Sequence, residues 1–179
     1  MPSPALRAAL AADIPALEAL IARSAAGLGA GFYTPAQTAA LAREVFGVDS
    51  QLVTDGTYFV IDADGAAVAC GGWSRRSTRF GGDKMKAEPD RLLDPATEAA
   101  KIRAFFVDPA VARRGYASAL MRHCTAAAKA AGFTQLELVA TMPGVPLYLA
   151  HGFAVVERFD LALAHGAVTA PMALMRRAV

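Results

Sequence analysis

The 179-residue chain has few cysteines and little net charge. Its two cysteines, Cys70 and Cys124, show no metal-ligand spacing, so a disulfide scaffold and a zinc site are both disfavoured and a reducing compartment is expected. No uninterrupted apolar run reaches the roughly 20 residues of a membrane span. Acidic residues interrupt the N-terminal stretch, which does not read as a secretory signal. The formal net charge of +2 is too small to favour nucleic-acid binding. We therefore expect one soluble, cytoplasmic domain over residues 1–179, without membrane or nucleic-acid partners.

The hydrophobic pattern alternates between strand-like and helix-like segments. A strand–helix–strand order requires a right-handed helical crossover between parallel strands, so we predict an α/β (α+β) fold. Its mixed sheet should have about six or seven strands, helices at its flanks and one central parallel pair. The expected segments are a strand at 6–10, a helix from 14, a helix from Thr34 to about Phe46, a hairpin at 57–73, a polar loop at 75–98, a strand at 101–107, a helix after 115, a strand at 135–140, a short helix at 145–153, and two strands around 164–167.

The segment FFVDPAVARRGYASALMRH, residues 105–123, leads from a predicted strand through an Arg-Arg-Gly turn into a predicted helix. The first N–H groups of a helix lack intrahelical partners and lie at its positive end, so they form a natural anion site. Gly115 allows close backbone approach, and Arg113 and Arg114 add positive charge. The turn has neither the Lys-Ser/Thr ending of a P-loop nor the glycine spacing of a dinucleotide fingerprint. A different phosphate-containing ligand is therefore indicated.

This turn resembles the signature of the GNAT superfamily of acetyl-CoA-dependent N-acyltransferases: Gln or Arg, two residues, Gly, one residue, then Gly or Ala. Here the six positions run from Ala112 to Ala117, and only the first departs from the pattern. The resemblance covers nearly the whole chain, because the order of elements, VDP before the turn and LYLAHGF after the next strand fall where the family has them. It implies a GNAT-like sheet and acetyl-CoA as co-substrate, with no metal.

The resemblance also implies how the coenzyme is held. Backbone N–H groups from Arg113 to Ser118 would bind the pyrophosphate, and the backbone of residues 105–107 would bind the pantetheine arm as an added strand does. The alternative is that the two arginines are solvated residues beside a helix start. The implied coenzyme-binding residues are Phe105, Phe106, Val107, Arg113, Arg114, Gly115, Tyr116, Ala117 and Ser118.

Two residues are candidates for the chemistry. Tyr148, in LYLAHGF, matches the family tyrosine that protonates or hydrogen-bonds the leaving sulfur; the alternative is a core tyrosine. Glu137 lies where some family members have a glutamate that draws the amine proton through water; the alternative is a carboxylate at a solvated sheet edge. At another family position for an acid, this chain has Arg103. The three histidines, His123, His151 and His165, are expected at the surface.

Three residues are predicted to contact the acceptor. Strand alternation would place Arg103 on the same face as Phe105 and Val107, where it would bind a carboxylate or phosphate of an amine acceptor. Tyr33 and Trp73 would supply apolar walls. The alternative for Arg103 is an internal pair with an acid such as Glu98.

The sequence thus predicts transfer of an acetyl or other acyl group from acetyl-CoA to an amine, and the expected acceptor is a small molecule. Two alternatives stay open: a protein N-terminal or lysine acetyltransferase, and a catalytically silent CoA-binding regulatory domain. A homodimer is compatible with the sequence.

Overall fold

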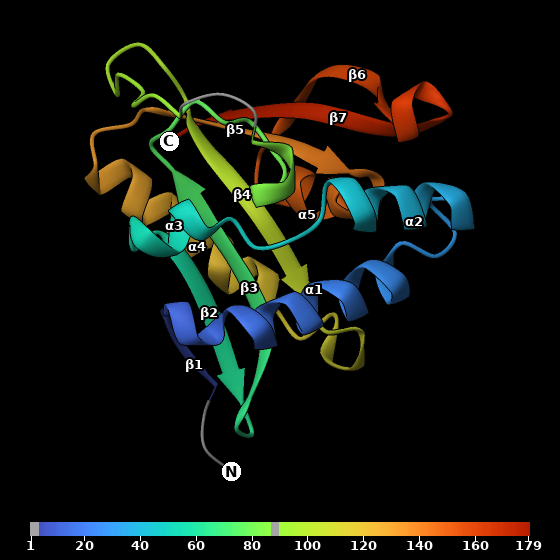
Figure 1. Ribbon diagram of the computed structural model, residues 1–179. Coiled ribbons are helices and arrows are strands. Elements are labelled where there is room, and N and C mark those ends of the chain that lie inside the picture. The colour runs from blue at the N-terminus through green and yellow to red at the C-terminus, as the bar shows by residue number, and fades with distance from the viewer. Residues whose placement is uncertain (1–3, 87–89) are drawn as a thin grey trace.

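A seven-stranded mixed sheet, in the order β1-β2-β3-β4-β5-β7-β6, forms the centre of the molecule. The computed structural model describes residues 4–86 and 90–179. In Figure 1, α1 and α2 lie in front of the sheet, and α4 and α5 lie behind it. Every strand pair is antiparallel except β4–β5, which is parallel and is joined by α4. The predicted fold class is confirmed.

The elements follow the predicted order, with one addition. The strands are β1 (Ala5–Ala8), β2 (Tyr58–Ala63), β3 (Ala66–Ser74), β4 (Ala100–Val107), β5 (Gln135–Thr141), β6 (Ala154–Leu163) and β7 (Val168–Ala178). The helices are α1 (Ile14–Leu28), α2 (Pro35–Glu44), α3 (Ser50–Thr54), α4 (Tyr116–Ala130) and α5 (Val145–Ala150). Helix α3 was not predicted, because five residues are too few to show a helical period. The stretch at 87–89 of the predicted loop lies outside the described residues.

Local side-chain contacts set where α2 and α3 begin. At α2, the Thr34 hydroxyl accepts from the Gln37 N–H at 3.2 Å, and the Gln37 side chain accepts from the Thr34 N–H at 2.9 Å. This capping box satisfies two N–H groups that have no intrahelical partner. At α3, the Asp49 carboxylate accepts from the Gln51 N–H at 3.1 Å. Asp49 therefore caps the N-terminus of α3.

The sheet has a separate apolar core on each face. On the α4 side, Leu120, Met121 and Cys124 pack with Leu136 of β5. On the α1 side, the buried residues are Ala9, Leu17, Leu20, Ile21, Val48, Leu52, Tyr58, Val60 and Cys70. Each fully buried leucine or valine contributes about 1.5–3 kcal/mol. The two layers hold β4 between them.

Both cysteines are free and buried, as the sequence predicted. Burial raises the pKa of Cys70 to about 12. Burial also raises the pKa of Cys124. Reactive thiols need a lowered pKa and an accessible, electropositive setting. Neither cysteine is therefore a nucleophile in this fold.

Strand β4 changes character at Ala104, which has a left-handed backbone with φ of 55°. Its parallel ladder with β5 consists of two pairs, at Ala100 and Lys101, and the two strands diverge beyond them. A register shift against β3 accompanies the bend. Such a bulge places consecutive side chains on one face. The second half of β4 is left without a ladder partner on the β5 side.

The bulge overturns the predicted alternation of side chains along β4. Phe105 and Val107 pack on the α4 side of the sheet with Ile102. Arg103 instead contacts Asp49, beside α3 on the other face. The prediction that Arg103 shares a face with Phe105 and Val107 is wrong, because strict alternation requires a regular strand.

Candidate active site

A cavity of about 730 Å³ lies where β4 and β5 diverge. The cavity is surrounded by the C-terminal end of α1, the second half of β4, the start of α4 and α5. Its lining includes Leu28, Phe32, Phe106, Gly115, Leu147 and Tyr148. The fold thus brings the Arg-Arg-Gly turn, the open part of β4 and Tyr148 to one cavity, although they are far apart in sequence.

The turn before α4 presents a row of unpaired backbone donors. Arg113 and Gly115 both have left-handed backbones, with φ of 66° and 85°. Across the described residues, no N–H group from Arg113 to Ser118 donates a hydrogen bond within the protein. Arg113 and Arg114 are exposed, and neither has a carboxylate within 4 Å among residues 4–86 and 90–179. Free N–H groups at the start of a 15-residue helix form a concave anion site.

The open half of β4 borders the same cavity. Phe105, Phe106 and Val107 all line it. The N–H group of Val107 donates to the Ser24 hydroxyl of α1 at 3.3 Å. Ser24 therefore already occupies one donor of this edge, a contact that the sequence did not indicate.

Tyr148 projects from α5 into the divergence of the strands. Its ring is edge-on to Phe105 and Phe153, with centroids 6.5 and 6.0 Å away. A Cβ at Gly144 would lie 2.9 Å from the ring, so this position requires a glycine. In the part of the chain that is described, the Tyr148 hydroxyl makes no hydrogen bond, and burial raises its pKa. The phenol is protonated and available as a donor.

A second, smaller cavity of about 70 Å³ meets the first at Tyr148. Phe46, Phe105, Phe106, Thr141 and Tyr148 line both cavities. The residues that line only the smaller one include Arg79, Phe80, Gly81, Val139 and Met172. The hydroxyl-bearing ring thus lies at the junction of a large and a small compartment.

Glu137 is buried and surrounded by cations. Its Oε1 lies 2.8 Å from Lys101 Nζ and 3.4 Å from Arg79 Nε, and its Oε2 lies 2.7 Å from Arg176. Burial raises the pKa of Glu137, but the hydrogen bonds and charges of Lys101 and Arg176 together lower it below the ordinary value. The alternative of a solvated edge residue is wrong, since the residue is only 3% exposed.

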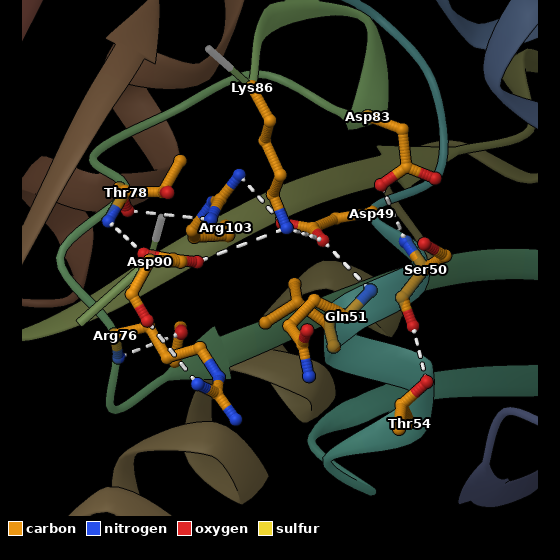
Figure 2. Close-up of polar contacts among 12 residues, drawn as sticks. Asp49, Ser50, Gln51, Thr54, Arg76, Thr78, Asp83, Lys86, Asp90 and Arg103 are labelled. Atoms are coloured by element: carbon orange, nitrogen blue, oxygen red, sulfur yellow. Dashed lines mark hydrogen bonds and ion pairs between the residues drawn. The ribbon is translucent and has the colours of Figure 1, made fainter. Parts of the chain in front are cut away.

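Arg103 is enclosed in the polar network of Figure 2. Its Nη2 lies 2.8 Å from Asp49 Oδ2, and Lys86 Nζ lies 2.5 Å from Asp49 Oδ1. The guanidinium also donates to the carbonyls of Thr78 and Gly81. The residue borders the smaller cavity, but its side chain is 1% exposed. The internal pair that the sequence left open is therefore real, with Asp49 in place of Glu98.

The two predicted apolar walls lie in different places. Tyr33 lines the large cavity, and its hydroxyl donates to the Pro171 carbonyl at 2.8 Å and accepts from the Met142 N–H at 2.9 Å. Trp73 is buried on the α4 side, where its ring packs against Phe133. Trp73 lines neither cavity, so its predicted contact with an acceptor is not supported.

His151 and Ser118 make a contact that sequence reasoning missed. The His151 Nε2 lies 3.0 Å from the Ser118 hydroxyl, at the end of the anion site. Burial, with the charges of Arg177 and Arg122, lowers the pKa of His151. His123 and His165 are exposed as predicted, whereas His151 is half-buried. A neutral imidazole orients the Ser118 hydroxyl.

Comparison with known families agrees with this geometry. The family profile described as Acetyltransferase (GNAT) family matches residues 28–153. The chain belongs to the GNAT acetyltransferase family. It is thus an acyltransferase, and its matched region contains the anion site, the open half of β4 and Tyr148. No curated protein sequence matches the chain.

Solved structures share the GNAT fold over the full chain. A GCN5-related N-acetyltransferase from Rhodopseudomonas palustris is 18% identical with a TM-score of 0.72, covering 100% of this chain and 98% of the other. The PaiA N-acetyltransferase from Thermoplasma acidophilum, in complex with coenzyme A, is 14% identical with a TM-score of 0.66, covering 99% and 100%. A ribosomal-protein alanine N-acetyltransferase from Escherichia coli is 15% identical with a TM-score of 0.60, covering 98% and 94%. At these identities the likeness concerns the fold alone.

None of the helices in the described ranges is long and apolar enough to cross a membrane.

Proposed function

We propose that this GNAT enzyme transfers an acetyl group from acetyl-CoA to the amine of a small molecule. One observation carries the proposal: Tyr148 lies where a large cavity with an anion site meets a small cavity. The large cavity suits a coenzyme, and the small one suits an acceptor. Acetyl-CoA supplies an activated thioester, and the protein supplies binding, orientation and a hydrogen-bond donor.

The residues of the large cavity fit coenzyme A. The N–H groups from Arg113 to Ser118 would hold its pyrophosphate, with charge from Arg113 and Arg114. Since Phe105, Phe106 and Val107 have no β5 partner, their backbone groups other than the Val107 N–H, which donates to Ser24, would bind the amides of the pantetheine arm. The Tyr116 and Ala117 positions complete the first turn of α4 around the phosphates.

Tyr148 would act on the leaving sulfur. When an amine attacks the thioester carbon, the C–N bond forms, the C–S bond breaks, and the thiolate must gain a proton. With unperturbed pKa values, transfer from tyrosine to a thiolate is uphill by roughly 2 kcal/mol. Burial raises the pKa of Tyr148, which makes complete transfer still less favourable. Hydrogen-bond donation to the sulfur as charge develops is the step that this environment supports.

Glu137 would position neighbouring cations, while solvent would accept the amine proton. Both of its oxygens are within 2.8 Å of cationic nitrogens. The lowered pKa of Glu137 also makes it a weak base. These contacts favour a structural role over the predicted base.

The volume of the smaller cavity favours a small acceptor over a protein segment. At about 70 Å³ it admits only a small group beside Tyr148. The Escherichia coli neighbour acts on an alanine of a ribosomal protein, so a protein acceptor is the alternative to be tested. The junction position of Tyr148 favours a working enzyme over a silent CoA-binding domain.

The test combines acetyl-CoA calorimetry with a screen of small amines and peptides in which released CoA is measured. The parent should bind acetyl-CoA and acetylate small amines. Tyr148→Phe should keep acetyl-CoA binding while turnover falls by about two to four orders of magnitude. Full turnover in Tyr148→Phe, with chemistry limiting the rate, would reject its role. Binding without transfer to any acceptor would instead indicate a silent domain.

A further inference from the structure

The cluster around Glu137 has more positive than negative charge. Three cations, Arg79, Lys101 and Arg176, share this one carboxylate. In residues 4–86 and 90–179, no other carboxylate lies within 4 Å of these three cations, so the local sum is three positive charges and one negative, or +2. Excess charge beside a cavity attracts an anion.

Arg79 is the cation with the most unused bonding capacity. Its Nε lies 3.4 Å from Glu137 Oε1. Lys101 Nζ lies closer to the same oxygen, at 2.8 Å, and Arg176 Nη2 lies 2.7 Å from Glu137 Oε2. Its side chain is 52% exposed, and it makes no hydrogen bond to the described residues. A guanidinium has five N–H donors in a planar fork that matches a carboxylate or phosphate. Arg79 therefore retains the donors that such a group needs.

The backbone on both sides of Arg79 is fixed. The Thr78 N–H donates to Asp90 Oδ1 at 2.8 Å, and the Thr78 and Gly81 carbonyls accept from Arg103 (Figure 2). Arg103 is in turn held by Asp49. Arg103 thus anchors the segment that carries Arg79. Because this segment is already held, less conformational entropy is lost when Arg79 binds a ligand.

The position of Arg79 sets the length of the ligand. Arg79 lines the small cavity together with Val139 and Thr141 of β5 and with Tyr148. One face of β5 carries every second residue, which here are Glu137, Val139 and Thr141. The backbone positions of Glu137 and Thr141 are therefore separated by roughly 13 Å. An anionic group at Arg79 and an amine near Tyr148 would lie on the order of 10 Å apart or less.

We propose that Arg79 is a specificity residue that binds the carboxylate or phosphate of a small amine acceptor. The inference rests on the proposed function, because it names the class of molecule that fills the small cavity. Arg79 thus takes the acceptor-binding role that the sequence predicted for Arg103. Both residues line the small cavity, but Arg103 is enclosed and Arg79 is half-exposed.

The test compares matched acceptors by kcat/KM in the parent, Arg79→Gln and Arg91→Gln. The acceptors are γ-aminobutyrate against n-butylamine, ε-aminocaproate against n-hexylamine, O-phosphoethanolamine against ethanolamine, and a short peptide with a free N-terminus. Arg91 is the control because it also lies in the segment between β3 and β4, pairs with a glutamate and is 62% exposed, but does not line the cavity. The carboxylate and phosphate pairs distinguish the two sources of the anion.

The parent should prefer the anionic member of at least one pair by about tenfold or more, as hydrogen bonds to charged groups predict. Arg79→Gln should reduce this ratio to about one, and Arg91→Gln should keep it. Equal preferences in the parent, an unchanged ratio in Arg79→Gln, or transfer to the peptide alone would overturn the inference.

A binding measurement separates this inference from the proposed function. Calorimetry of O-phosphoethanolamine and ε-aminocaproate with the acetyl-CoA-loaded parent and both variants does not depend on turnover. If nothing is acetylated but Arg79→Gln alone loses binding of these two compounds, the proposed function fails. The role of Arg79 in binding a carboxylate or phosphate then still stands. If the parent binds neither anion, the inference is overturned whatever the enzyme acetylates.

Discussion

The two halves of β4 differ in how many of their polar groups have partners inside the protein. The first half is paired with β5 at Ala100 and Lys101, and the Arg103 side chain is enclosed with Asp49. The second half, beyond the bulge at Ala104, has no β5 partner and borders a cavity of about 730 Å³. Charge alone therefore does not mark a binding residue. A ligand needs groups whose bonding capacity the fold has left unused.

The arginines follow the same division. Arg103 is buried and paired, whereas Arg113 and Arg114 are exposed beside unpaired N–H groups. Removing the carboxylate partner of Arg103 should therefore destabilise the fold. Removing Arg113 and Arg114 should instead weaken acetyl-CoA binding.

The largest effect is expected from Asp49→Asn. The change preserves the shape at the start of α3 but leaves Arg103 and Lys86 without their shared carboxylate. Breaking a buried ion pair costs about 3–5 kcal/mol, so the free energy of unfolding in urea should fall by that amount. Glu98→Gln, which removes the partner of exposed Arg91, is the control and should shift the midpoint much less. An equal loss of unfolding free energy in the two variants would show that burial does not increase the contribution of an ion pair to stability.

Glu137→Gln should have the next largest effect, and it should depend on pH. At neutral pH the free energy of unfolding should fall by about 3 kcal/mol, since Arg79 and Arg176 can still reach water. The folded-state pKa of Glu137 is lowered, so its contribution is fully present above the unfolded pKa of about 4.3 and is lost as pH falls through the folded pKa. Urea unfolding at neutral and acidic pH should show that the free energies of unfolding of the parent and the variant become more similar in acid. A constant difference would contradict the assigned contacts.

Arg113→Ala/Arg114→Ala should weaken acetyl-CoA binding by about tenfold or more, because hydrogen bonds to charged groups contribute about 1.5–3 kcal/mol. The salt dependence of binding should also become shallower. Calorimetry at two salt concentrations measures both effects. Arg43→Ala/Arg91→Ala removes the same net charge from exposed positions elsewhere and should not change affinity. A similar loss in both double variants would point to overall charge in place of a local site.

The smallest effect on stability is expected from Gly115→Ala. Gly115 has φ of 85° with no atom within 4 Å of an added Cβ, and Gly65 in the β2–β3 turn has φ of 80° with the same open space. Each alanine should lower the free energy of unfolding by about 1 kcal/mol, the cost of a left-handed backbone. Thermal unfolding should show similar losses, but only Gly115→Ala should weaken acetyl-CoA binding, because its methyl group enters the anion site. Unchanged binding in Gly115→Ala would place the phosphates elsewhere.

Sequence patterns were sufficient to predict the order of elements, the parallel β4–β5 pair and the Arg-Arg-Gly turn. These features depend on near neighbours: hydrophobic period, capping residues such as Thr34, and a glycine with a left-handed backbone. The family resemblance also placed Tyr148, which the structure locates at the junction of the cavities.

Contacts between distant segments determine which charged groups remain available to a ligand. The bulge at Ala104 reverses the face of Arg103, and its partner Asp49 comes from the start of a five-residue helix that showed no period in the sequence. Glu137 and Arg79 meet across 58 residues of chain. Ion pairing and enclosure depend on contacts between distant segments, and no local pattern encodes them, so Arg79 could be distinguished from Arg103 only after the chain was folded.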